Sequence, residues 1–340
     1  AERAVLLAFI HQDDGDPSIP LLATEIVTPL AEDTVEAWHA WTEGATVLTT
    51  PDERVNDYLV GQRTIILVQK AYNGSSQPMS EYTGAWLRDQ AGPVRYLLRT
   101  GMAEVAREML DYLWLATLAF GDIANAYVGS YRPQDAGPEP DWASMGVMDG
   151  RERAESPSYV PLMHRWYWRA TGDGAFFAER RGWLGACLDR QDFTDNLLPF
   201  STDETFRTAM AASHGHDVVE QFEFDFFSAN SSFLWVAAAE GMAEMAPALL
   251  GTDGEALAEH YTVRAGEVRA AAEATFMTPE GVYHPYITES TGEPAIAPFE
   301  DVNTKPIWTG YVAPSDAMAT DQLAGVITAL GGEDGVLVSE

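Results

Sequence analysis

The chain has 340 residues, of which 46% are apolar, so it can form one large domain or two ordinary ones around a sizeable core. Asp and Glu number 52 against 20 Lys and Arg, which gives a formal net charge of −32. This charge excludes nucleic acid and anionic membrane surfaces as expected partners, because both repel a polyanion. We expect a surface adapted to a high-salt (halophilic) or acidic habitat, with a specific cationic partner as the alternative.

Cys187 is the only cysteine, so an intrachain disulfide is impossible. It shares the apolar face of a predicted helix with Leu184 and Leu188, which favours a small buried hydrophobic side chain over a nucleophile. We find no run of about 18 apolar residues that would predict a membrane span. The chain begins with Ala1 inside an apolar run, so both ends are interpreted as cut, and cytoplasmic and secreted locations both stay open.

Residues 1–33 differ from the rest of the chain. A short apolar run at 4–10 is followed by the turn-rich stretch 13–17 and then by a second run at 23–27. This pattern predicts strand, turn and strand. The segment is too short for a domain, so we interpret it as the tail of a β-rich segment or of an upstream domain.

Helical patterns dominate from residue 50 onwards. The first helix is predicted to begin with Thr50 as its cap and Pro51 in its first turn, and to run to about residue 72. Further helices are predicted at 84–100, directly after Gly101, and at 157–171, 175–190, 229–250, 254–276 and 315–330. Between the last two, residues 281–312 are predicted as a strand-like turn region.

Three of these helices recur at equal intervals, each followed at once by a second amphipathic helix. Their starts near residues 84, 156 and 228 lie 72 residues apart, and they end at Gly101, Gly172 and Gly251. Repeated helix pairs of this length predict an all-α fold, an (α/α)6 toroid spanning residues 34–340. The eight predicted helices fill about two thirds of such a ring, so we expect the remaining hairpins beyond Glu340, with 315–330 as the fourth inner helix.

The sharpest local motif stands at the start of the first inner helix. It contains Tyr82, Trp86, Arg88 and Asp89 in the run YTGAWLRD. The run resembles the W-x-R-D motif of glucoamylase-like, six-hairpin glycoside hydrolases, a resemblance that extends as architecture over residues 50–330. It implies that Trp86 stacks on a sugar face while Arg88 and Asp89 hold hydroxyls of the non-reducing terminal sugar. The alternative is an Arg88–Asp89 ion pair at a helix start, with Trp86 in the core.

The connection 192–227 carries the candidate catalytic acids. The family has a Trp-Glu-Glu sequence before the third inner helix, whereas this chain has Glu204, Glu223 and Asp225 there. An inverting glycosidase needs a protonated acid and a second carboxylate about 6.5–9.5 Å apart, with room for water. Glu204 stands in a polar stretch, and Asp225 stands among phenylalanines that would raise its pKa. Each of these carboxylates could instead be a solvated charge. In the family the catalytic base precedes the last inner helix, a region that we expect beyond Glu340, so we name no base.

Four further residues are expected near the same site: Trp142, Glu155, Lys305 and Trp308. Glu155 precedes the second inner helix, where it could instead act only on the helix dipole. His164 stands among apolar residues and is predicted to be core. No nucleotide-binding glycine motif and no metal-ligand spacing is present, so we predict no cofactor and no metal.

These features together predict an exo-acting, inverting glycoside hydrolase whose partner is an oligo- or polysaccharide. A polysaccharide lyase shares the toroid fold, but it would need Tyr, His and Arg around a uronate, and the acidity of the chain disfavours an anionic polymer. A non-catalytic toroid that binds a glycan or a protein is the remaining alternative.

Overall fold

The structure is a computed structural model. It describes residues 33–71 (without 34, 37 and 41), 73–77, 84–121, 123–124, 126–127, 137–142, 156–198, 226–294, 300–332 and 335–336. The predicted β segment at the N-terminus therefore lies outside the described residues, apart from Asp33.

Helices make up most of the described chain. They are α2 (Glu53–Gln69), α3 (Leu87–Arg99), α4 (Ala103–Phe120), α5 (Ser156–Thr171), α6 (Gly174–Asp189), α9 (Ala229–Leu250), α10 (Thr252–Phe276), α11 (Glu300–Thr309) and α12 (Ala317–Leu330). The described strands are short antiparallel pairs: β1 (Ala85–Trp86) with β2 (Ala126–Tyr127), β3 (Phe226–Ser228) with β4 (Tyr286–Thr288), and β5 (Gly331–Gly332) with β6 (Gly335–Val336). The predicted all-α toroid architecture is confirmed.

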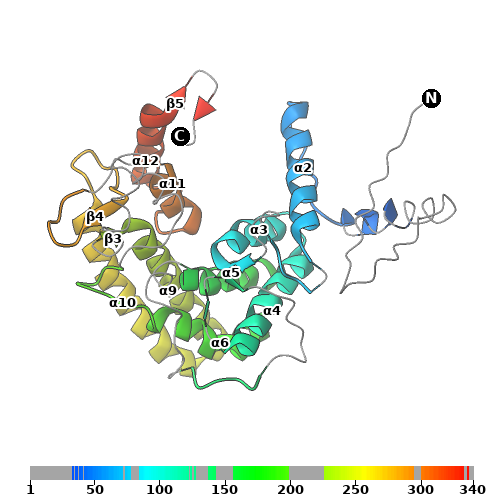
Figure 1. Cartoon of the computed structure of the whole chain (residues 1–340), viewed down its shortest axis with the longest axis horizontal. Coiled ribbons are helices and arrows are strands. Elements are labelled where there is room, and N and C mark those ends of the chain that lie inside the picture. The colour runs from blue at the N-terminus through cyan, green and yellow to red at the C-terminus, as the bar shows by residue number, and fades with distance from the viewer. Residues whose placement is uncertain are drawn as a thin grey trace, which may run out of the picture.

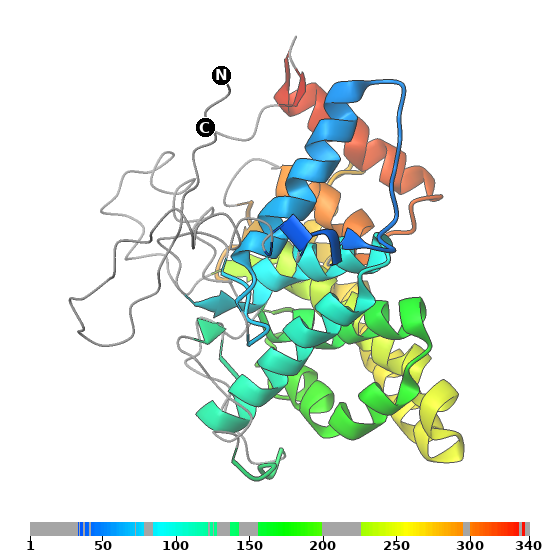
Figure 2. The ribbon, with the colours of Figure 1, turned by 90° about the vertical axis from the view of Figure 1, so that its right-hand side faces the viewer.

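The helices form an arc of two layers (Figure 1). The inner helices α3, α5, α9 and α11 pack side by side in that order, and α4, α6 and α10 lie outside them. In both views α2 and α12 lie at the upper ends of the arc, with α6 at its base (Figure 1, Figure 2).

Glycines at positive φ reverse the chain between inner and outer helices. Gly101, Gly172 and Gly251 have φ of 80°, 75° and 58°. Only glycine enters this region without steric cost, which lets the second helix of each pair return antiparallel to the first. The predicted ends of the three inner helices are therefore confirmed.

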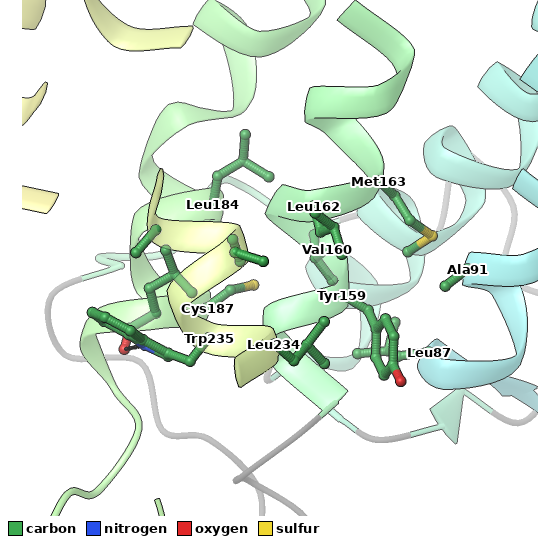
Figure 3. Packing of buried hydrophobic residues seen from close by; sticks show 14 of the residues in the cluster. Leu87, Ala91, Tyr159, Val160, Leu162, Met163, Leu184, Cys187, Leu234 and Trp235 are labelled. Carbon is green, nitrogen blue, oxygen red and sulfur yellow. Dashed lines mark hydrogen bonds between the residues drawn. The ribbon is translucent and has the colours of Figure 1, made fainter. Parts of the chain in front are cut away.

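The core lies between the two layers and is centred on α9. Figure 3 shows Met163 of α5 lying toward Ala91 of α3, and Cys187 of α6 lying beside α9. Cys187 is fully buried and burial raises the pKa of its thiol, as expected for a structural cysteine. Within the described residues, α9 alone is long and apolar enough to cross a membrane by length and composition. Its apolar window is 61% buried, because α9 packs against α5, α6, α10 and α11.

His164 of α5 is a core residue, as predicted. Its Nδ1 lies 2.8 Å from the carbonyl oxygen of Val160, and its ring stacks on Phe176 with centroids 5.2 Å apart. Burial, followed by the charge of Arg180, lowers the pKa of His164 to about 3, so the imidazole is neutral near pH 7.

Three local predictions were wrong. Residues 300–309 form the helix α11 where a strand-like turn was predicted, and α11 rather than 315–330 packs against α9 as the fourth inner helix. The helix α11 is short and contains Pro306, so its sequence does not show a helical pattern. Packing against other helices stabilises it instead. The first helix is capped by Asp52 instead of Thr50, because the Asp52 side chain accepts a hydrogen bond from the backbone N–H of Arg54.

Candidate functional site at the inner-helix entrance

The inner helices α3, α5 and α9 all begin at the same face of the arc, which we call the inner-helix entrance. Gln191, just after α6, donates a hydrogen bond of 2.8 Å to the hydroxyl of Ser158 in the first turn of α5. Trp235, in the second turn of α9, donates to the carbonyl oxygen of Leu188 near the end of α6. The strand before α3 pairs with the strand after α4. The ends of the outer helices therefore meet the starts of the inner ones.

The W-x-R-D residues occupy the start of α3. Trp86 is in extended conformation in β1, and α3 begins at the next residue, Leu87. Leu87 is fully buried, whereas Trp86, Arg88 and Asp89 are each half-buried. Asp89 lies in the first turn, where the helix dipole favours a carboxylate. The three residues thus have a fixed backbone and side chains that are partly accessible to solvent, as a sugar-binding set requires.

The segment before α9 is held from both sides. The Ser228 N–H donates to the carbonyl oxygen of Leu198 at 3.1 Å, and the Leu198 N–H donates to the hydroxyl of Ser232 at 3.2 Å. On the other side, Ser228 pairs with Tyr286 of β4. Leu198 is the last described residue before the long connection, and Phe226 is the first one after it. Both residues therefore lie at the inner-helix entrance.

Small polar residues at this end were missed by the sequence reasoning. Ser158, Ser228, Asn230 and Ser231 are all buried in the first turns of α5 or at the start of α9. The hydroxyl of Ser231 has no hydrogen-bond partner among the described residues. Buried hydroxyl groups normally have hydrogen-bond partners. The available signal was the run SANSS, which begins at an inner-helix start.

Five predicted site residues lie outside the described part of the chain. These are Tyr82, Glu155, Glu204, Glu223 and Asp225. Glu155 directly precedes the first residue of α5 in the sequence, and Asp225 directly precedes the first residue of β3. Their placement at the site stays a prediction.

Trp142 packs against the outer layer. Its ring stacks on Trp114 of α4 with centroids 5.4 Å apart, and Trp142 also lines a shallow groove between α6 and α10 beside Asp189 and Tyr261. Burial raises the pKa of Asp189, although its hydrogen bond from Tyr261 acts in the opposite direction. The described geometry brings Trp142 together with these outer-layer residues.

Trp308 faces the inside of the arc, far along the inner helices from their starts. Its ring meets Trp166 of α5 edge to face, with centroids 5.2 Å apart. The guanidinium of Arg95 from α3 lies 5.2 Å from the centre of the Trp308 ring. Trp308 thus joins a cluster near the C-terminal ends of α3, α5 and α11. Among the residues that the structure describes, no group of three or more His, Cys, Asp or Glu could hold a metal ion.

Comparison with known proteins places this geometry in a known fold. No family model matches the chain, and no curated protein matches its sequence. A solved glycosidase is 15% identical with a TM-score of 0.58, over 84% of this chain and 72% of that protein. A GH63 mannosylglycerate hydrolase from Thermus thermophilus is 14% identical with a TM-score of 0.53, over 81% of this chain and 78% of that protein.

An α-L-rhamnosidase from Dictyoglumus thermophilum is 14% identical with a TM-score of 0.52; the match covers 85% of this chain and 30% of the rhamnosidase. At such low identity these matches establish the fold and nothing finer. The chain has the helical toroid fold of these glycosidases, which confirms the resemblance predicted from the sequence.

Proposed function

We propose that the chain is a glycoside hydrolase that removes a terminal sugar from an oligo- or polysaccharide. One observation carries the proposal: Trp86, Arg88 and Asp89 lie together, half-buried, at the inner-helix entrance of a toroid shared with solved glycosidases. Two of the similar solved structures, a glycosidase and the mannosylglycerate hydrolase, contain glucose.

Each of the three residues has a distinct role in this proposal. The Trp86 indole offers an apolar face to the C–H groups of the sugar ring. The Asp89 carboxylate accepts hydrogen bonds from sugar hydroxyls, and the Arg88 guanidinium donates to hydroxyl oxygens. A carboxylate that accepts such a bond contributes about 1.5–3 kcal/mol.

The general acid is proposed to be Glu204 or Asp225, with Glu223 next. Both ends of the connection that carries them, Leu198 and Phe226, lie at the inner-helix entrance. The acid protonates the glycosidic oxygen while a second carboxylate activates a water on the opposite face of the sugar, which inverts the anomeric centre. A phenylalanine on each side of Asp225 in the sequence would raise the pKa of its carboxyl.

The test is a panel of neutral and uronate-containing oligosaccharides, with products followed by NMR from the first turnovers. We expect a single sugar released from the non-reducing end with the opposite anomeric configuration. A retained anomer would contradict inversion, and internal cleavage would contradict exo action. An unsaturated uronate would show a lyase instead, whereas saturable glycan binding without any product would show a binding toroid.

A further inference from the structure

A cavity of about 650 Å³ lies inside the arc, at the opposite end of the inner helices from their entrance. The last turns of α3 and α5 and the end of α11 form its walls. Four arginines and two tryptophans dominate the lining: Arg95, Arg99, Arg165, Arg169, Trp166 and Trp308. We call this cavity the arginine pocket. No aspartate or glutamate is among the described residues that line it.

This concentration of positive charge runs against the composition of the whole chain. The chain carries a net charge of −32, and two of its 20 basic residues are lysines, which leaves 18 arginines. Four of them line one pocket, although 52 carboxylates were available for pairing. Like charges that converge with few counter-charges repel one another and destabilise a fold. An anion bound among these arginines would offset that repulsion, which favours its binding here.

One carboxylate behind the lining compensates only part of the charge. Glu244 of α9 accepts hydrogen bonds from Arg165 at 2.8 Å and from Arg169 at 2.7 and 2.8 Å. Burial alone would raise the pKa of Glu244, but the bonds from Arg169 and Arg165 outweigh it and lower the pKa, so the carboxylate is ionised. A single negative charge is thus shared by two arginines.

The remaining two arginines stand on α3. Arg95 donates a hydrogen bond to the main-chain carbonyl oxygen of Trp308, and its guanidinium lies 5.1 Å from the ring centre of Trp166. Burial, followed by the neighbouring charge of Arg99, lowers the pKa of Arg95. The lining and Glu244 together therefore keep three positive charges in excess.

We propose that the arginine pocket binds a small phosphorylated molecule. Guanidinium groups match the oxygens of a phosphate in a bidentate geometry, and a dianionic phosphate offsets most of the excess charge. Arg95 and Arg99 face it from α3 and Arg169 from α5, while Trp166 and Trp308 offer an apolar wall to the organic part of the ligand.

The site is separate from the proposed sugar site. Arg95 and Arg99 follow Asp89 on the same helix by six and ten residues, which is about 9 and 15 Å along its axis. A ligand in the arginine pocket also ties α3 and α5 to α11, so its binding stabilises the arc against opening.

Binding is measured on the 340-residue chain by calorimetry and by tryptophan fluorescence, because two indoles line the pocket. The probes are glucose 6-phosphate, inorganic phosphate and glucose, with sodium chloride at matched ionic strength. We expect saturable binding and a higher melting temperature with glucose 6-phosphate, weaker binding of inorganic phosphate, and none of glucose at this pocket. Equal affinity for glucose 6-phosphate and inorganic phosphate would show that the pocket does not recognise the organic part of the ligand. An equal response to sodium chloride would show that the pocket is not a phosphate site.

Variants locate the binding. Arg95→Gln and Arg99→Gln should each weaken glucose 6-phosphate about tenfold or more, since each removes a charged donor. Arg54→Gln is the matched control, because this arginine is 90% exposed on α2 and pairs with Asp52. Exposed Arg99 keeps the test valid if the Arg95 variant folds poorly.

The opposite change completes the test. Glu244→Gln removes the one compensating carboxylate and should tighten phosphate binding several-fold. An affinity equally reduced in the Arg54 and Arg95 variants, or lowered by Glu244→Gln, would contradict the proposal. Both results would leave the glycosidase proposal untouched, because that one is judged by sugar release alone.

Discussion

Arg95 on α3 donates a hydrogen bond to the main-chain carbonyl oxygen of Trp308 on α11, a residue 213 positions later in the chain. The bond joins the first and the fourth inner helices across the inside of the arc, since α5 and α9 lie between them in the ring. The bond lies in one of two chemically different regions of the inner helices. Their starts carry small hydroxyl residues and the W-x-R-D set, whereas their ends carry arginines and indoles.

The buried imidazole of His164 predicts a loss of stability in acid. Its pKa in the folded chain is about 3, against 6.5 for a free histidine, chiefly because it is buried. Between pH 6.5 and about 3 the unfolded chain therefore binds a proton at His164 that the folded chain does not bind. This contribution to the free energy of unfolding is complete above pH 6.5 and is lost as the pH falls toward 3. Between pH 7 and 4.5 the loss from this residue is about 2–3 kcal/mol.

Urea unfolding at the two pH values checks this prediction in His164→Gln. The variant should lose about 2–3 kcal/mol less than the wild type on going from pH 7 to 4.5. His39→Gln removes an exposed imidazole and serves as the control substitution. Equal pH dependence in the wild type and His164→Gln would mean that the buried imidazole does not resist protonation.

At Gly254 the backbone of α10 lies close to the backbone of α9. A Cβ atom placed there would lie 2.1 Å from the carbonyl oxygen of Ala246, a backbone atom that cannot move aside. Gly254→Ala should therefore lower the free energy of unfolding by about 1–3 kcal/mol or more. Gly266→Ala in the same helix meets no atom within 4 Å and should raise it by up to about 1 kcal/mol.

Urea denaturation of both alanine variants tests the pair. Opposite signs support the tight packing at Gly254, because intrinsic helix propensity favours alanine over glycine at both sites. A stabilising effect at Gly254 would show that the two helices pack with more space between them than the structure gives.

The hairpins could be predicted from the sequence because local chemistry determines them. Gly101, Gly172 and Gly251 end the inner helices at positive φ, and the helix 229–250 was predicted with the bounds that α9 has. Each of these features depends on residues within a few turns of one another. Periodicity and a terminal glycine therefore sufficed for the inner–outer order of three hairpins.

Features that depend on distant contacts could not be predicted. α11 is short and contains Pro306, so its stability comes from packing on α9 rather than from propensity. The stacking of Trp142 on Trp114 joins a loop to an outer helix and left no periodic signal. The arginine pocket assembles from three helices that are far apart in the sequence, and its arginines stand on two of them, α3 and α5. The placement of the candidate catalytic acids remains a prediction, because all of them lie outside the described residues.

Asp89 at the inner-helix entrance is the sharpest test of the sugar-binding set. Asp89→Asn keeps the shape of the side chain but removes the charge that accepts hydroxyl hydrogen bonds. We expect kcat/KM to fall by about tenfold to a hundredfold, which corresponds to about 1.5–3 kcal/mol, while the fold stays intact.

Asp253→Asn is the matched control for this experiment. Asp253 is an exposed aspartate in the first turn of α10, so the substitution removes the same favourable interaction with a helix dipole. Its helix begins at the other end of the toroid, next to the turn at Gly251. Unchanged kinetics in Asp89→Asn, together with an equal loss of stability in the two variants, would reduce Asp89 to a helix-start charge.

The general acid is tested by Glu204→Gln and Asp225→Asn on two kinds of substrate. A general acid contributes about 10²–10⁴-fold, so loss of the true one should lower turnover by that factor on a natural glycoside with a poor leaving group. The loss should shrink on an activated aryl glycoside, because its leaving group departs with little protonation. A residue that only shapes the site would lower both rates alike. If neither variant loses more than about tenfold on the natural glycoside, the acid lies elsewhere, and Glu155 before α5 becomes the next residue to substitute.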